Sequence, residues 1–242
     1  YVTEEYRVRY VDQENVYLLD YNRSQEAMFT TNNIDASSNS FKLGVLEDDN
    51  FQYMASSDLN KVAFTQARQL WYYDYSSGTI TNVYGFCQDD NYTDVRVTYD
   101  ENNIKILRMT EKGNITFAVY GYMNRGIHEG KVGIAVYEFN AEKDKIQEIL
   151  FVENDKPYNI LKDDMETLLY LNSDDEFYYF DNDSVVCIDT KTLKSELFIE
   201  DILSENLAVS QDNHLIGYPN ELLTENTTMI TVFDLETKKS QE

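Results

Sequence analysis

Residues 58–81 read DLNKVAFTQARQLWYYDYSSGTIT, and this stretch decides the fold. A polar turn leads into the apolar run 62–64, and a second apolar run, 70–73, ends at Asp74. The turn 75–78 follows, and a further run begins at Thr79. Short apolar and aromatic runs beside turns of Asp, Asn, Ser and Gly are typical of β-hairpins, because these residues tolerate left-handed or Asx-type geometry. The stretch therefore predicts strands joined by tight turns.

An acidic residue follows a short apolar run at five places in the chain. These landmarks are Asp20, Asp74, Glu138, Asp189 and Asp234, and successive ones are 54, 64, 51 and 45 residues apart. Blades of β-propellers repeat every ~40–50 residues, so longer loops account for the wider intervals. A helical solenoid would need apolar residues three and four apart, and no window shows that spacing beyond a turn or two. We expect each landmark to end a strand and enter a tight turn.

A polar turn that feeds a strand recurs upstream of four landmarks. The four turns are 56–61, 111–114, 162–166 and 210–214, and they lead into 62–64, 115–120, 167–171 and 215–218. An up-and-down four-stranded blade has this order of elements: turn, strand, strand, acidic turn and strand. Apolar residues alternate along these strands, which predicts that one set packs between neighbouring blades. The set comprises Val62, Phe64, Phe117, Val119, Leu169, Leu171 and Ile216.

The stretch from Asp58 to Thr81 resembles a blade of the TolB-like and WD40-like β-propeller superfamily. In that superfamily a turn precedes the inner strands, and an Asp-x-x-x-Gly turn, here Asp74 to Gly78, joins the two outer strands. The resemblance covers most of the chain as a pattern, although the Gly-His and Trp-Asp dipeptides of WD40 repeats are absent. A fainter similarity to bacterial, membrane-anchored proteins with extracytoplasmic propellers implies a place at the cell surface, with the anchor outside this segment. No residue role is carried over from these families.

We therefore predict an all-β fold, a β-propeller of four-stranded antiparallel blades with about five blades visible. The blades are expected at roughly 1–45, 46–90, 91–153, 154–200 and 201–242, in one propeller domain or part of one. The last blade stops where its outermost strand should begin, so either a five-bladed ring closes or further blades lie outside this chain. We favour the larger ring. The absence of Met at position 1 adds the expectation that the chain is a portion of a longer protein.

The charge of the chain is strongly acidic, with 44 Asp and Glu against 20 Lys and Arg and a net charge of −24. Nucleic-acid binding needs a basic footprint to neutralise phosphates, and no Lys/Arg cluster is present. An anionic membrane surface would repel the chain for the same reason. No apolar run is long enough to span a bilayer, so we expect no membrane insertion by this segment. These features exclude nucleic acid as a partner and leave protein, peptide or glycan ligands.

Metal and cofactor chemistry finds little support in the sequence. Cys87 and Cys187 lack metal-ligand spacing, and a bridge between them is possible but without local support. Cys187 lies in an apolar run and is expected to be buried. His128-Glu129 lacks the second histidine of a zinc helix motif, since position 132 is Val. Acidic clusters such as 89–94 could hold Ca²⁺ but match no calcium loop, so we predict no metal and no cofactor.

The widest interval between landmarks contains the candidate site, because insertions between propeller strands carry function. Segment 120–133 holds four of the nine glycines and several convergent polar groups. Arg125, His128 and Glu129 are expected to project together beside Tyr120 or Tyr122, which suits a peptide or a sugar. The alternative is a hairpin that merely joins two strands of one blade. The candidate ligand-binding residues are Tyr120, Tyr122, Asn124, Arg125, His128 and Glu129.

Two functions remain open from the sequence. The first is a non-catalytic binding, sensing or scaffold module outside the cytoplasm, with an unknown ligand. The alternative is a propeller glycoside hydrolase that uses paired carboxylates in the central channel, about 5–10 Å apart. A Ser-His-Asp hydrolase is excluded because no Gly-x-Ser-x-Gly elbow exists. The sequence predicts no catalytic residues and favours the binding module.

Overall fold

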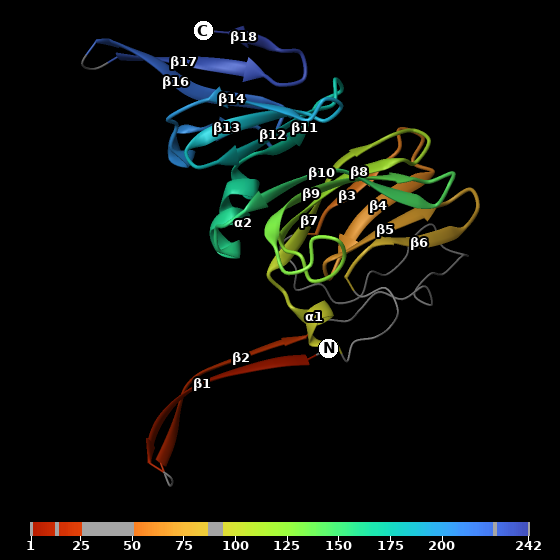
Figure 1. Cartoon of the computed structure of the whole chain (residues 1–242), viewed down its shortest axis with the longest axis vertical. Coiled ribbons are helices and arrows are strands. Elements are labelled where there is room, and N and C mark those ends of the chain that lie inside the picture. Colours follow the sequence, from red (N-terminus) through yellow and green to blue (C-terminus); the bar gives the residue numbers. More distant parts are fainter. Residues whose placement is uncertain (1, 13–14, 26–50, 87–93, 225–226, 242) are drawn as a thin grey trace. The chain divides into compact units, whose positions relative to one another are not determined.

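A computed structural model describes residues 2–12, 15–25, 51–86, 94–224 and 227–241. In these parts the chain forms four antiparallel sheets of four strands each and one two-stranded sheet (Figure 1). The chain divides into two compact units, Tyr1–Gly85 and Phe86–Glu242. The predicted all-β class and its four-stranded antiparallel sheets are confirmed. In each four-stranded sheet, neighbouring strands are consecutive in the sequence, as in a meander.

The first unit contains a two-stranded hairpin and a four-stranded sheet. Phe64 and Trp71 are buried in the four-stranded sheet and pack with Phe51, Val62 and Ile80. Ala63, Leu70 and Tyr72 are buried as well, and successive side chains of a strand point to opposite faces, so both faces of this sheet carry buried apolar side chains. The strands of the unit are β1 (Val2–Asp12), β2 (Asn15–Gln25), β3 (Tyr53–Ala55), β4 (Lys61–Gln66), β5 (Gln69–Asp74) and β6 (Thr79–Tyr84).

The prediction that the first landmark, Asp20, ends a strand is wrong. Asp20 lies inside β2 opposite Arg7 and does not end the strand, because pairing continues past it through Tyr21 opposite Tyr6. The large apolar side chains of the hairpin are exposed on both of its faces, and the described residues show two strands of this predicted blade. Residues 26–50, which include the end of the first predicted blade, lie outside the described residues.

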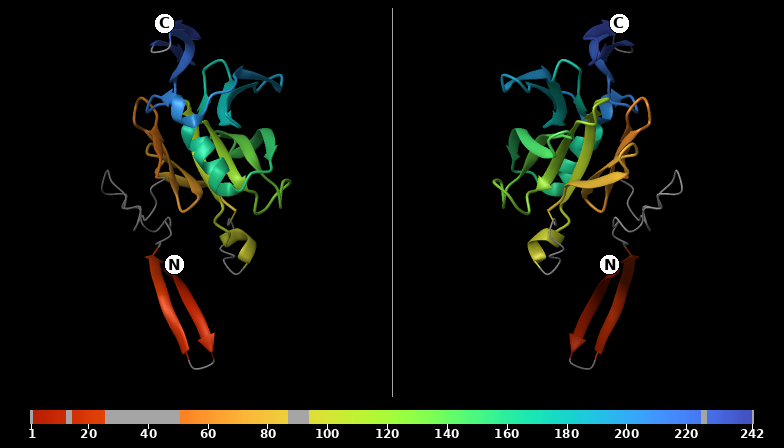
Figure 2. Two further views of the ribbon diagram at one scale, coloured as in Figure 1. Left: turned by 90° about the vertical axis from the view of Figure 1, so that its left-hand side faces the viewer. Right: turned by 90° about the vertical axis from the view of Figure 1, so that its right-hand side faces the viewer.

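The second unit contains three four-stranded sheets and the helices (Figure 2). The first sheet comprises β7 (Asn102–Met109), β8 (Ile115–Tyr122), β9 (Val132–Asn140) and β10 (Lys145–Asn154). The second comprises β11 (Leu169–Leu171), β12 (Glu176–Asp181), β13 (Ser184–Asp189) and β14 (Lys194–Ile199). The third comprises β15 (Ala208–Val209), β16 (Leu215–Thr224), β17 (Thr227–Asp234) and β18 (Lys239–Gln241). The helices are α1 (Val95–Thr98), α2 (Tyr158–Thr167) and a 3-10 turn at Ser204–Asn206.

In the middle sheet of the second unit, β11–β14, the inner strands β12 and β13 are buried on both faces. Phe177 and Tyr179 point to one face and pack with residues of β8, β9 and α2. Tyr178 and Phe180 point to the other face and pack with Ile216 of the last sheet. A strand that is buried on both faces reads as a continuous apolar run rather than an alternating one. This explains the sequence Phe-Tyr-Tyr-Phe in β12.

Six of the seven residues predicted to be in the core are buried, and Val62 is partly buried. Leu169 and Leu171 pack in the cluster between the first and second sheets of the second unit, and Ile216 packs in the cluster between the second and third. Cys187 is buried and carries a free thiol. Cys87 lies outside the described residues.

The landmark turns share one hydrogen bond. Asp74, Asp189 and Asp234 end β5, β13 and β17, and their Oδ1 atoms accept from the backbone N–H three residues later at 3.3, 2.9 and 3.1 Å. In the sheet β7–β10 this role belongs to Asn140, whose Oδ1 accepts from an N–H three residues later at 2.9 Å. Glu138 lies two residues earlier inside β9, so this landmark was wrong by two positions. An asparagine carbonyl serves the turn as well as a carboxylate does.

The turns between the first and second strands also share a motif. The side-chain oxygens of Ser56, Thr110, Asn172 and Ser210 each accept from the backbone N–H at the start of the next strand, at 2.8–3.1 Å. The predicted turn at 162–166 is wrong, because this segment lies within α2 and the turn of that sheet begins at Asn172.

The number of blades in a complete ring stays a prediction. In the described parts of the chain, each sheet takes its strands from one continuous segment. An exchange of end strands, which would close a propeller, is not seen there. The blade boundaries and the single-domain arrangement also stay predictions.

Candidate functional site

The candidate segment forms the hairpin loop 123–131 between β8 and β9. The Met123 N–H donates to the Lys131 carbonyl at 2.8 Å, and the Gly130 N–H donates to the Met123 carbonyl at 3.0 Å. Gly126 and Gly130 have φ values of 97° and 88°, a backbone region that favours glycine. Gly126 and Gly130 therefore shape the loop.

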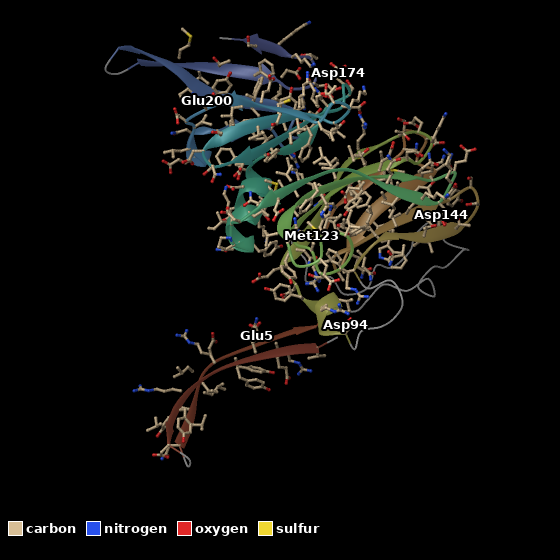
Figure 3. The ribbon with its side chains drawn as sticks, in the orientation of Figure 1. Glu5, Asp94, Met123, Asp144, Asp174 and Glu200 are labelled. Carbon is tan, nitrogen blue, oxygen red and sulfur yellow. The ribbon has the colours of Figure 1, made fainter. Side chains whose placement is uncertain are left out.

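Arg125 and Glu129 both contact the start of α1. The Arg125 guanidinium lies 2.7 Å from a carboxylate oxygen of Asp94, and Arg96 lies 2.9 Å from Glu129 and 2.7 Å from Asp94. Asp94 precedes α1 and Met123 begins the hairpin loop (Figure 3). These four charged residues, Arg125, Asp94, Arg96 and Glu129, form one chain of ion pairs, which we name the ion-pair surface.

Hydrogen bonds within the ion-pair surface favour the charged forms of Asp94 and Arg96. Hydrogen bonds from the Arg96 guanidinium and its backbone N–H lower the pKa of Asp94 to about 2. Hydrogen bonds to Asp94 and Glu129 raise the pKa of Arg96. The side chains of Arg125, Arg96 and Glu129 remain 43%, 53% and 40% exposed. The surface therefore offers fixed charges of both signs to the solvent.

His128 is not part of the ion-pair surface and contacts β10 instead. Its ring stacks on Phe151 of β10, with centroids 3.7 Å apart and an angle of 10° between the planes. Its Nε2 atom lies 2.9 Å from a carboxylate oxygen of Glu148, also in β10. His128 therefore pairs with β10, whereas Arg125 and Glu129 pair with α1.

The remaining predicted residues support the loop. Tyr120 is buried in the core between the first two sheets of the second unit. Asn124 is buried, accepts from Asn102 at 3.2 Å and donates to the Tyr99 carbonyl at 2.8 Å. Tyr122 is partly buried and meets the ring of Tyr99 edge-on at 5.1 Å. The ring of Tyr99 is exposed, so it adds an aromatic surface next to Tyr122.

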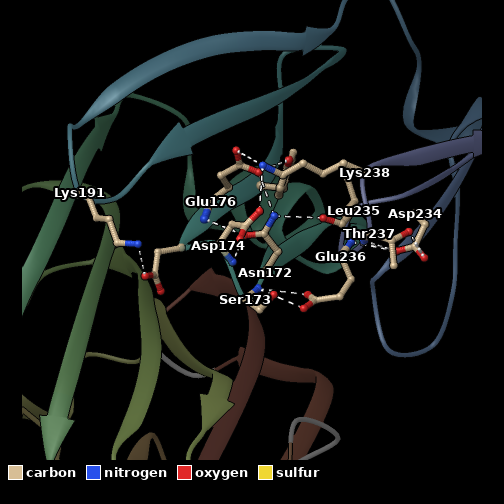
Figure 4. A network of polar contacts seen from close by, with 12 residues as sticks. Asn172, Ser173, Asp174, Glu176, Lys191, Asp234, Leu235, Glu236, Thr237 and Lys238 are labelled. Atoms are coloured by element: carbon tan, nitrogen blue, oxygen red, sulfur yellow. Dashed lines mark hydrogen bonds and ion pairs between the residues drawn. The ribbon is translucent and has the colours of Figure 1, made fainter.

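A second polar cluster joins the last two sheets of the second unit (Figure 4). The Asn172 amide donates to the Leu235 carbonyl at 3.1 Å, and Tyr170 donates to Glu236 at 2.6 Å. Lys238 reaches across to Glu176 at 2.7 Å. These groups satisfy one another between two turns, which indicates a structural role.

Two carboxylates approach each other near α2. Asp164 of α2 and Asp181 at the end of β12 both accept a hydrogen bond from the Lys156 ammonium, at 2.6 Å for Asp181. Burial raises the pKa of Asp164 although the Lys156 hydrogen bond acts in the opposite direction. A glycosidase needs space for substrate between its carboxylates, and here a lysine bridges them.

No family model matches this chain, and no curated protein matches it. Among solved structures it is similar to an oligogalacturonate lyase in complex with manganese, with a TM-score of 0.39 and 8% identity over 72% of this chain and 44% of the lyase. It is similar to the tricorn protease, with a TM-score of 0.38 and 14% identity over 82% of this chain and 18% of the protease. These neighbours are propeller-like.

A further similar structure is the extracellular domain assigned to a one component system of B. thetaiotaomicron. Its TM-score is 0.27, with 11% identity over 84% of this chain and 34% of that domain. The chain thus spans less than half the length of each of these three structures. At such low identity the likeness concerns the fold alone.

In the described parts of the chain, no helix is both long and apolar enough to cross a bilayer. Within the same residues, no three His, Cys, Asp or Glu side chains gather in an arrangement that could hold a metal ion.

Sequence reasoning missed Asp94, Arg96 and Tyr99. In the sequence Asp94 belongs to the acidic cluster 89–94, and α1 is only four residues long, too short for a periodic pattern. The partners Arg125 and Glu129 lie about 30 residues further along the chain, and sequence spacing alone does not reveal such pairs.

Proposed function

We propose that this chain is a non-catalytic binding or sensing module that recognises a protein, peptide or glycan through the ion-pair surface. One observation carries the proposal: Arg125, Arg96 and Glu129 are held in a single chain of ion pairs while their side chains stay 40–53% exposed. The exposed ring of Tyr99 lies beside α1 and adds an aromatic contact. An acidic peptide segment or an acidic glycan fits this chemistry best.

The ion-pair surface suits binding because its arginines can exchange a carboxylate of the protein for a carboxylate of a ligand. Exposed ion pairs contribute little to folding, so a ligand carboxylate can replace a protein carboxylate on Arg96 or Arg125 at small cost. Guanidinium groups bind carboxylates with two parallel hydrogen bonds, which gives the contact a fixed direction. The chain is strongly acidic elsewhere, so these arginines are a place where an acidic ligand meets positive charge.

We further propose an extracytoplasmic location in a bacterium, at the cell surface and anchored by a segment outside this chain. The pattern of residues 58–81 and the fainter likeness to anchored propeller proteins support this. Fractionation of cells that carry the full-length protein tests it. Detection in the membrane fraction, with protease sensitivity in intact cells, is the expected result.

The test of the binding proposal uses a double variant and a matched control pair that links the same loop to β10. Arg125→Ala combined with Glu129→Ala removes both ion pairs between the loop and α1. Lys131→Ala combined with Glu153→Ala removes another exposed pair, 2.6 Å apart, that is not part of the ion-pair surface. Both variants and the wild type are applied to arrays of acidic peptides and glycans, and their melting temperatures are compared.

We expect the Arg125/Glu129 variant to lose array binding and to melt close to the wild type. The Lys131/Glu153 variant should keep both properties. If the Arg125/Glu129 variant binds as the wild type does, or unfolds, the loop is a structural hairpin and the proposal is wrong.

A further inference from the structure

β7 carries a lysine that forms no ion pair within the described residues. Lys105 lies in the middle of this strand, is partly buried, and makes no hydrogen bond or ion pair with another residue in the described parts of the chain. Burial lowers its pKa to about 8, and the charge of Glu166 in α2 acts in the opposite direction. An ammonium group in such a place costs stability unless a partner neutralises it.

Asn103 presents a second donor without an acceptor on the same face. Side chains two residues apart lie on one face of a strand, and the pairing of β7 with β8 is regular from Asn102 to Ile106. Asn103 is 7% exposed, and its Oδ1 accepts from the Ile104 N–H at 2.8 Å. Its Nδ2 has no hydrogen-bond partner among the residues that the structure describes. Such orphan donors are rare in native proteins and call for a specific explanation.

The surroundings of the two donors are apolar. Asn103 lies opposite Tyr120 and Lys105 lies opposite Ala118, and both partners belong to the core cluster between the first two sheets of the second unit. Met165 of α2 belongs to the same cluster. A ligand at this position therefore needs a negatively charged acceptor group and an apolar body.

We propose that Lys105 and Asn103 bind a small carboxylate ligand with an apolar body. One carboxylate oxygen accepts from the Lys105 ammonium and the other from the Asn103 amide. This satisfies both donors and restores the charge balance that burial disturbs. The partial exposure of Lys105 gives access from solvent. The site lies on β7 and shares no residue with the ion-pair surface, so the two proposals stand separately.

The test follows the side-chain nitrogen of Lys105 by ¹⁵N NMR in the intact chain, with butyrate as the probe. Binding to the charged form raises the pKa of Lys105, by about one unit for a tenfold preference for the ammonium over the amine. Sodium chloride at equal ionic strength and the exposed Lys112 serve as controls, and neither the salt nor that residue should show the shift.

Two variants extend the test by calorimetry with butyrate. Lys105→Met and Asn103→Leu each remove one donor at similar size and should abolish or weaken binding at least tenfold. The Arg125→Ala/Glu129→Ala variant should bind butyrate as the wild type does, whatever happens to the array binding. If the Lys105 signal in the wild type does not respond to butyrate beyond the chloride control, or if Asn103→Leu binds normally, the carboxylate site is refuted.

Discussion

At the residue scale, the buried amine of Lys105 makes stability depend on pH. Its pKa is about 8 in the folded chain against an ordinary value of 10.5. Below about pH 8 the lysine is charged in both states, so the folded state bears the full cost of burying the charge. Between pH 8 and 10.5 the unfolded state binds more protons, so the free energy of unfolding rises with pH in this window.

Lys105→Met should therefore stabilise the chain at pH 7, by up to about 3 kcal/mol for a shift of this size. The gain over the wild type should shrink as the pH rises towards 10.5. Urea unfolding of both proteins from pH 7 to pH 10 measures the difference, with Lys112→Met as the exposed control. A gain that does not change with pH would show that the burial of charge is not its cause.

Phe64→Ala tests the core of the first unit. Phe64 is 1% exposed, and removal of a buried phenylalanine ring costs about 3–5 kcal/mol through lost transfer energy and the cavity left behind. Tyr53 lies directly opposite on β3 but is 71% exposed, so Tyr53→Ala should cost far less. Urea titrations followed by the fluorescence of Trp71 compare the two variants. Equal midpoints would place Phe64 outside the core.

At the scale of single elements, the landmark turns require a left-handed residue at a fixed place. Four residues after Asp74 and Asp189, the chain has φ values of 66° at Gly78 and 58° at Leu193. Glycine takes this conformation without strain, whereas a leucine is strained in it. The same turn is thus built with a favourable residue in one sheet and an unfavourable one in another.

Leu193→Gly should raise the free energy of unfolding by about 0.5–1 kcal/mol, because it relieves the strain and its exposed side chain loses little packing. Gly78→Ala should lower the free energy of unfolding, because alanine is strained at this positive φ. A Cβ at Gly78 meets no atom within 4 Å, so a steric clash would not be the cause. Thermal melts of both variants against the wild type measure the effect. A destabilised Leu193→Gly would mean that its side chain packs on the sheet.

The repeated turns explain how much of the fold the sequence predicts. Asx and Ser/Thr hydrogen bonds are local, so their residues stand out at regular distances along the chain. α2 was missed because only Leu161 and Met165 form its buried face, and its polar residues 162–166 resemble a turn. In the candidate site, Arg125 and Glu129 were found but Asp94 and Arg96 were not, since those ion pairs join distant segments. The burial of Tyr120 was missed because both faces of β8 are covered.

At the scale of the whole molecule, the net charge of −24 opposes the compact state. Carboxylates repel one another over distances that salt screens, with a Debye length of about 10 Å at 0.1 M. Exposed ion pairs such as Lys131–Glu153 contribute only ~0–1 kcal/mol each. Repulsion therefore dominates the dependence of stability on ionic strength.

The melting temperature at pH 7 should rise as sodium chloride increases from low to moderate concentration. Calorimetry or circular dichroism melts measure it, and potassium chloride at equal concentration should act alike, because the effect is screening. A rise with one salt alone would indicate specific ion binding, and a fall would show that the ion pairs outweigh the repulsion.

The burial of β12 and β13 on both faces has a consequence for how the chain is made. A ribosome releases the sheets in order, so the face that carries Tyr178 and Phe180 emerges before its cover, Ile216 and Leu235, has been translated. Because synthesis proceeds at about 5–20 residues per second, this face stays exposed to solvent for a few seconds on every nascent chain. Through that interval it is an apolar surface open to chaperones and to neighbouring polypeptides on the same polysome.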